Sequence, residues 1–225
     1  MGQVRAGDVR VEPVGGDERY EIAAEWTTLV KMLWDRDKEF DFEGKWFTAR
    51  NAISAPKPIQ HTPAIMSAGS SPQGMDFAAG NADICFAAAD SNESLAEVVK
   101  KIKDRAAEKG REVRGWTQAG ILCGPDQANV QRQYDHWVRE HGDYEAVGNQ
   151  ITKLMGGGGK TLDYKHDPVM LERMVAMMHS HPPYGTPAQI VEEMARLSEA
   201  GIDGINIVWP DYERGIEQCG TRSSR

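Results

Sequence analysis

The segment from Pro63 to Ala88 (PAIMSAGSSPQGMDFAAGNADICFAA) restricts the fold more than any other part of the chain. It places two short apolar runs, 64–68 and 82–88, on either side of a turn and a helix-forming stretch. Short apolar runs that are bounded by turn residues are typical of buried strands. The segment therefore predicts a strand–loop–helix–strand unit, from which parallel sheets with crossover helices are built.

The loop of this unit, Gly69-Ser70-Ser71, has the composition of an anion-binding site. Pro72 takes the first position of a predicted helix over 72–80, where its missing N–H group costs little. A helix N-terminus presents free N–H groups and a positive dipole end, and a glycine lets a ligand approach the backbone closely. Two interpretations stay open at this point: the loop binds a phosphate, or the serines only cap the helix.

The remainder of the chain continues the alternation of helices and strands. Amphipathic periodicity and capping residues predict further helices over 17–34, 93–109, 125–139, 168–179 and 187–200. Further strands are predicted over 112–122 and 203–209, with a separate hairpin over 40–48. Four strands joined by helices indicate an α/β fold and a partial (β/α)8 barrel, because the complete barrel has eight strands. The section 141–183, apart from its helix, and the tail 211–225 show little regular pattern.

Charge and cysteine content exclude several classes of protein. The net charge is −8 and no block is rich in lysine or arginine, which disfavours nucleic-acid and anionic-membrane partners. The three cysteines, Cys85, Cys123 and Cys219, form no CxxC pair, which fits a reducing cytoplasm. No long apolar stretch or signal peptide is found, so we expect a cytoplasmic protein whose 225 residues form a single domain.

Three other motifs are set aside. The glycine run at 155–161 differs from a nucleotide phosphate loop, because Leu154 stands where the first glycine of GxxxxGK[ST] is required. The pair of histidines in 179–181 has no third ligand nearby in the sequence, and His136 and His141 do not have the HExxH spacing. We therefore expect no metal site, and the absence of GxSxG argues against a serine hydrolase.

Four stretches resemble the bacterial luciferase-like family of flavin-dependent monooxygenases. They lie at 17–34, 40–83, 140–146 and 184–218. The second is the most specific, since it contains AGSSPQG followed by FAA and AD. Within the family, EHGDYEA at 140–146 and the GTP, GIDG and W ending are most similar to the branch of dimethyl-sulfone and alkanesulfonate monooxygenases.

The resemblance implies a β/α barrel, reduced FMN from a separate NAD(P)H flavin reductase, O2 as co-substrate and a homo-oligomer. The AGxSxxG loop of the family contacts the flavin phosphate, which maps that role onto Gly69, Ser70 and Ser71. The implied activity is an FMNH2-dependent monooxygenase acting on a small organosulfur compound such as a sulfone or alkanesulfonate. A pyrimidine-ring monooxygenase and a deazaflavin-dependent oxidoreductase of the same superfamily are the alternatives. The sequence identifies no catalytic acid or base.

The resemblance covers the C-terminal half of the family's barrel. We therefore expect a domain that is shortened at its N-terminus and altered after about residue 218, where the sequence reads CGTRSSR from 219 onward. A non-catalytic flavin-binding or assembly fragment of such an enzyme is the alternative from a different class of function.

Overall fold

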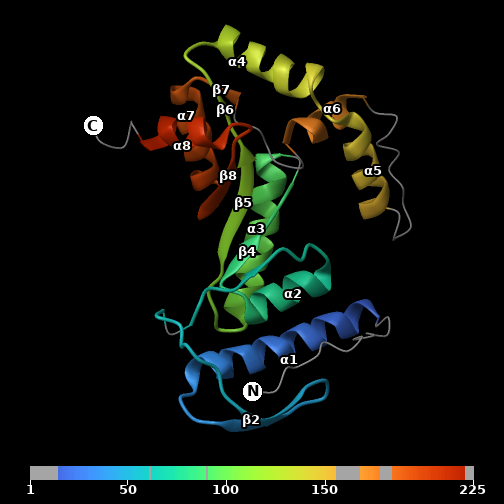
Figure 1. Cartoon of the computed structure of the whole chain (residues 1–225), viewed down its shortest axis with the longest axis vertical. Helices are drawn as coiled ribbons and strands as arrows, with labels where there is room; N and C mark the ends of the chain where they lie inside the picture. The colour runs from blue at the N-terminus through green and yellow to red at the C-terminus, as the bar shows by residue number, and fades with distance from the viewer. Residues whose placement is uncertain (1–14, 61, 90, 156–167, 178–183, 221–225) are drawn as a thin grey trace, which may run out of the picture.

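A parallel four-stranded sheet in the order β3-β4-β5-β8 forms the centre of the computed structural model (Figure 1). The structure describes residues 15–60, 62–89, 91–155, 168–177 and 184–220. The strands of the central sheet are β3 (Met66–Ser67), β4 (Ile84–Phe86), β5 (Arg114–Gly120) and β8 (Gly204–Val208). All three pairings are parallel, which confirms the predicted α/β fold with about four parallel strands. Within the described ranges, β3 and β8 are the two edges of this sheet.

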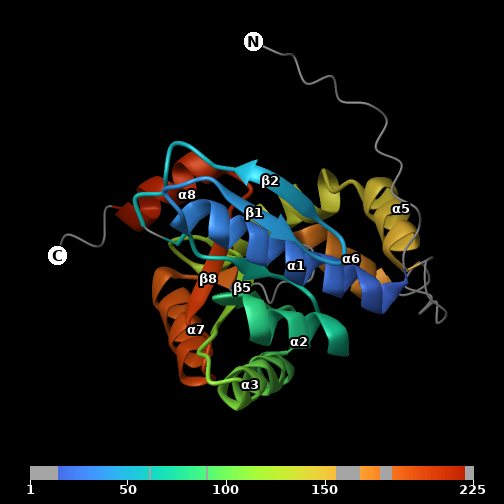
Figure 2. The same cartoon turned by 90° about the horizontal axis from the view of Figure 1, so that it is seen from below.

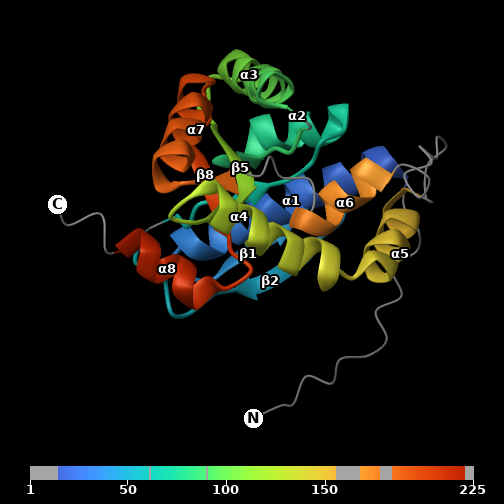
Figure 3. The ribbon, with the colours of Figure 1, turned by 90° about the horizontal axis from the view of Figure 1, so that it is seen from above.

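Three helices lie together on one side of the central sheet, as Figures 2 and 3 show from opposite directions. They are α2 (Pro72–Asn81), α3 (Asn92–Glu108) and α7 (Pro187–Glu199). The predicted boundaries of α3 and α7 are confirmed to within one or two residues. Gly110 and Gly201, just beyond the two helices, have φ values of 67° and 88°. This left-handed conformation is the one that glycine adopts most readily, so both helices end where the sequence predicts.

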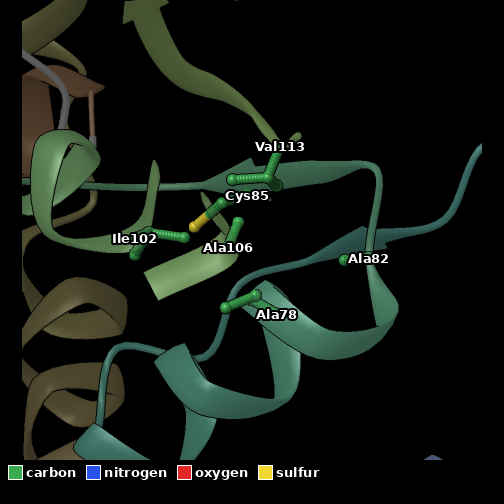
Figure 4. Packing of buried hydrophobic residues seen from close by; sticks show 7 residues of the cluster. Ala78, Ala82, Cys85, Ile102, Ala106 and Val113 are labelled. Carbon is green, nitrogen blue, oxygen red and sulfur yellow. The ribbon is translucent and has the colours of Figure 1, made fainter. Parts of the chain in front are cut away.

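The core between α2, α3 and the sheet is built mainly from small side chains (Figure 4). The members of this cluster are Ala78, Ala79, Ala82, Cys85, Ile102, Ala106 and Val113. Cys85 lies in β4 and is 1% exposed. Its burial raises the pKa of the thiol to about 11, so the nucleophilic thiolate is scarce at neutral pH. Cys85 is therefore a small core residue.

Helix α1 (Gly16–Asp35) lies beside α2, with the hairpin of β1 (Phe40–Glu43) and β2 (Thr48–Ala52) on its far side (Figure 1). The hairpin is attached to α1 by one side chain. The carboxylate of Glu25 accepts hydrogen bonds from the backbone N–H groups of residues 45, 46 and 47 at 2.9, 2.9 and 2.7 Å. The predicted hairpin is confirmed, although its second strand ends at Ala52 instead of residue 48.

Glu25 should make the stability of the hairpin depend on pH. Burial raises the pKa of this carboxyl, but the three N–H donors and Lys45 outweigh that effect and hold the pKa below 4.5. A lowered folded-state pKa stabilises the fold above pH 4.5, and this stabilisation is lost as the pH falls through the folded value. We expect Glu25→Gln to destabilise the protein at pH 7, with a smaller deficit at about pH 3, because that pH lies below the ordinary carboxyl pKa of 4.5.

Urea denaturation at both pH values measures this difference. Glu21→Gln is the matched control, because the Glu21 carboxylate forms an exposed ion pair with the Lys45 ammonium at 2.8 Å. Such exposed pairs contribute little, so the control should change stability only slightly at either pH. A deficit for Glu25→Gln that is equally large at pH 7 and pH 3 would contradict the assignment.

Several elements differ from the prediction. The helix predicted over 125–139 is α4 (Gln127–Tyr134) followed by the π-helix η1 (Asp135–Glu140). Three elements were not predicted: α5 (Tyr144–Met155), α8 (Tyr212–Gly220) and β7 (Tyr184–Gly185), which pairs with β6 (Leu122–Cys123). The helix predicted over 168–179 is α6 (Pro168–Met177). The glycines at 156–159 and the histidines of 179–181 lie outside the described residues. In the part of the chain that is described, no helix combines the length and the apolar character of a membrane span.

Candidate functional site

The carboxyl ends of the four parallel strands lie at the same end of the sheet, and the candidate site lies at this C-terminal end. Ligand-binding residues of α/β sheets and barrels are found at the C-terminal end of the strands, because the loops that follow the strands converge there. The loop 68–71 follows β3, residues 121–123 follow β5, and residues 209–211 follow β8. The predicted phosphate loop is therefore located where a ligand site of this architecture is expected.

The backbone of the loop lies directly against the first turn of α2. A Cβ atom on Gly69 would approach Gly74 Cα to 2.7 Å and the hydroxyl oxygen of Tyr20 to 3.1 Å. A Cβ atom on Gly74 would lie 2.8 Å from Gly69 Cα and 2.7 Å from the same hydroxyl. Neither position has room for a side chain. The two glycines thus allow the loop to fold back onto the N-terminus of the helix.

Ser71 is the N-cap of α2, which confirms that a serine of the loop caps the helix. Its Oγ accepts a hydrogen bond from the Gly74 N–H at 3.1 Å, while its own hydroxyl donates a long bond of 3.5 Å to Tyr20. Ser70 is exposed. Among the described residues, the backbone N–H groups of Ser70, Ser71 and Gln73 have no hydrogen-bond acceptor. The cap therefore leaves a set of donors that suits an anion.

The charges around this helix N-terminus favour an anion as well. Arg105 of α3 donates to the Pro72 carbonyl at 3.0 Å and to the Asp76 carboxylate at 3.1 Å. Asp76 is the acidic group next to the first turn of α2, and this ion pair compensates its charge. The carboxylate of Asp76 therefore opposes the positive dipole end of α2 less than an unpaired carboxylate would.

A cleft of about 320 Å³ lies at the same C-terminal end of the strands, beyond the ends of β6 and β8. Its apolar lining includes Ile121, Leu122 and Trp209. Its polar lining comes from α4, η1 and α8: Asn129, Arg132, Gln133, His136 and Arg214. Gln133 donates to the Cys123 carbonyl at 3.0 Å and to the Asn129 side chain at 2.7 Å, which fixes α4 against β6.

Two arginines, Arg132 and Arg214, line this cleft together with the carboxylate of Asp211. Arg132 and Arg214 are exposed, and neither guanidinium contacts a carboxylate of the described residues. Exposed guanidiniums without an acid partner attract anions and oxygen acceptors. No sequence motif marks this pair, because Arg214 lies on α8, which was not predicted. Trp209 was expected to pack, and it does contact Gly215, but it also lines the cleft.

Comparison with known proteins agrees with the family resemblance. The model of a family described as luciferase-like monooxygenase matches residues 3–204. The pyrimidine monooxygenase RutA of Caulobacter segnis is 27% identical over 214 residues, which cover 91% of this chain and 58% of RutA. The chain therefore spans little more than half the length of this relative.

Two solved structures have the same fold over most of the chain. DmoA from Hyphomicrobium sulfonivorans matches with a TM-score of 0.76 and 20% identity, over 88% of this chain and 53% of DmoA. Riboflavin lyase RcaE, determined with modified FMN and riboflavin, matches with a TM-score of 0.72 and 20% identity, over 88% of this chain and 55% of RcaE. At these identities the likeness shows the fold alone. With the family model matched over residues 3–204, the chain belongs to the luciferase-like monooxygenase family.

Proposed function

We propose that this chain binds reduced FMN as part of a two-component monooxygenase that uses O2 and acts on a small organosulfur compound, such as a sulfone or an alkanesulfonate. The observation that carries the proposal is the donor set of the loop 69–71 at the N-terminus of α2. Members of the family use reduced flavin, and the phosphate is the anionic part of FMN. A separate NAD(P)H flavin reductase would supply the reduced cofactor.

The residues present fit a flavin phosphate. The N–H groups and hydroxyls of Ser70 and Ser71, with the N–H of Gln73, would hold it, and the dipole of α2 would stabilise its charge. When bound, reduced FMN supplies the electrons with which O2 is activated. The chain's own part is to hold the cofactor, to orient the substrate and to exclude water. The apolar lining of the cleft and its two arginines suit a substrate with a small apolar body and sulfonyl oxygens.

Two alternatives are each favoured by a specific observation. Similarity to RutA favours a pyrimidine substrate equally well, because ring carbonyl oxygens also accept hydrogen bonds from Arg132 and Arg214. A non-catalytic flavin-binding or assembly fragment is favoured by the span of about half the relatives' length and by the position of β3 and β8, which are the edge strands of the sheet among the described residues. Edge strands can pair with another chain.

An anaerobic titration with reduced FMN tests the proposal. We expect saturable binding that becomes about tenfold weaker in Ser71→Ala, as the loss of one charge-assisted hydrogen bond predicts. Ser91→Ala is the matched control, because Ser91 caps α3 through an equal bond of 3.1 Å from the Ser94 N–H. Both variants lose a cap, at a cost of about 1 kcal/mol in stability, but only Ser71→Ala should lose affinity for the flavin.

The substrate is tested with a flavin reductase added to the chain. Sulfite or sulfinate released from an alkanesulfonate or a sulfone, with matching NADH use, supports the organosulfur proposal. Consumption of uracil instead identifies the pyrimidine alternative. Flavin binding without turnover of either substrate supports the fragment alternative, and a folded chain that binds no reduced FMN overturns the proposal.

A further inference from the structure

The π-helix η1 brings together two histidines that an α-helix would separate. The N–H of His141 donates to the carbonyl of His136 at 3.2 Å, which is the five-residue hydrogen bond of a π-helix. With 3.6 residues per turn, an α-helix would point positions five apart about 140° away from each other. The wider turn places His141 over His136 instead. His136 and His141 therefore meet although they are five residues apart and do not have the HExxH spacing.

Glu140 completes a cluster of three ligand-bearing side chains. Its Oε2 lies 3.3 Å from His136 Nδ1, and the ring centroids of His136 and His141 are 4.5 Å apart at an angle of 72°. One ligand atom from each residue lies within 4.8 Å of the other two. All three side chains are exposed, so they can rotate to close the remaining distance. Four-residue spacing alone explains the contact between Glu140 and His136, but not the approach of His141.

The surroundings leave the carboxylate of Glu140 available. Arg139, the cation on the same turn, is held by Asp135 at 2.8 Å and by Glu172 of α6 at 3.0 Å. It therefore does not neutralise Glu140. Trp137 packs with its ring edge against His136, with centroids 5.3 Å apart, and restricts the orientation of that imidazole.

We propose that His136, Glu140 and His141 bind a divalent transition-metal ion of the zinc class. Zinc–nitrogen and zinc–oxygen bonds of about 2.0–2.1 Å place tetrahedral ligand atoms about 3.3 Å apart, which is the separation of His136 Nδ1 and Glu140 Oε2. Imidazole ligands favour zinc, nickel or cobalt over magnesium or calcium. Three protein ligands leave a fourth position open to water or to a ligand.

The position of the cluster gives the metal a role that is separate from the flavin site. His136 also lines the cleft, together with Arg132, Arg214 and Asp211. A metal ion held by His136 would add a positive centre beside this lining, with an open coordination position for an anionic or oxygen-bearing ligand. The proposal rests on η1 alone and does not depend on the proposed monooxygenase activity.

Titration of the metal-free full chain tests this site. We expect one equivalent of Co2+ to produce the visible absorption of a tetrahedral site, and Zn2+ to displace it. His136→Ala and His141→Ala should each weaken the binding of Zn2+ at least tenfold in calorimetry, and Glu140→Gln should weaken it as well. Circular dichroism spectra that match the wild type would show that these exposed substitutions leave the fold intact.

The double substitution His179→Ala/His181→Ala is the matched control, because it removes two other histidines that the sequence places close together. We expect the variant to bind Zn2+ within about twofold of the wild type. Loss of binding in this variant, with binding kept in His141→Ala, would assign the metal to the other histidines and overturn the proposal. A wild-type chain that binds no Zn2+ or Co2+ at about 1 mM would overturn it too.

Discussion

Gly74→Ala is expected to abolish saturable binding of reduced FMN and to lower the free energy of unfolding by about 1–3 kcal/mol. The new Cβ atom would lie 2.8 Å from the Gly69 Cα atom and 2.7 Å from the Tyr20 hydroxyl oxygen. The Gly69 backbone has no side-chain rotamer that could yield, so the loop must move away from α2. This movement separates the loop donors from the helix N-terminus, and both are needed for the proposed phosphate site. Anaerobic flavin titration and urea denaturation measure the two effects.

Gly80→Ala is the control for this prediction, because the same substitution is made in the same helix. The nearest atom to its new Cβ would be Lys109 Cδ at 3.8 Å, which is an ordinary contact. Alanine is preferred to glycine inside a helix by about 0.5–1 kcal/mol, so this variant should be as stable as the wild type or more stable. Its flavin affinity should not change. If Gly74→Ala behaves like Gly80→Ala, the close approach of loop and helix does not hold in solution.

The parts of the fold that local chemistry determines could be predicted from the sequence. Helix α2 was expected over 72–80 and is found over Pro72–Asn81, because Ser71 caps it and Pro72 starts it. The strands were expected at the apolar runs and are found there, although β3 and β4 are shorter than the runs. Apolar character marks the buried stretch, whereas pairing with a neighbouring strand decides how much of that stretch becomes strand.

The elements that were missed depend on contacts between distant parts of the chain. Strand β7 has two residues, too few to show a period, and its partner β6 lies about 60 residues earlier. In α8, no apolar stripe was evident, and Ile216 is 59% exposed. The contact between Gly215 and Trp209 orders this helix against the end of β8. A single sequence contains no signal for such pairings.

The candidate site was predictable to the same extent. The loop 69–71 could be singled out as a candidate, because glycine and serine before a helix have a direct chemical meaning. The pair Arg132 and Arg214 could not, since it is assembled from two helices that are remote in sequence. The pair His136 and His141 was set aside because it lacks the HExxH spacing, and the π-helix that brings the two side chains together has no recognisable sequence pattern.

Ile102→Ala is expected to lower the free energy of unfolding by about 3–5 kcal/mol. Ile102 is 1% exposed and is among the largest fully buried side chains of the described residues. Figure 4 shows its side chain directed at Cys85, and four of the other six buried members of its cluster are small: Ala78, Ala79, Ala82 and Ala106. Alanine side chains have no rotamers with which to fill the cavity, so the site should collapse little and the cost should lie in the upper part of the usual range. Urea denaturation followed by circular dichroism measures it.

Ile59→Ala removes the same atoms from an exposed position and is the control. Ile59 is 102% exposed, so its truncation should change stability by less than about 0.5 kcal/mol. The difference in unfolding free energy between the two variants measures the packing of α3 on β4. This packing supports β4 and its partner β3, after which the loop 69–71 follows. Ile102→Ala should therefore also weaken reduced-FMN binding near its melting temperature, where the C-terminal ends of these strands become less ordered. Equal stabilities for the two variants would show that α3 is not packed against the sheet in the folded protein.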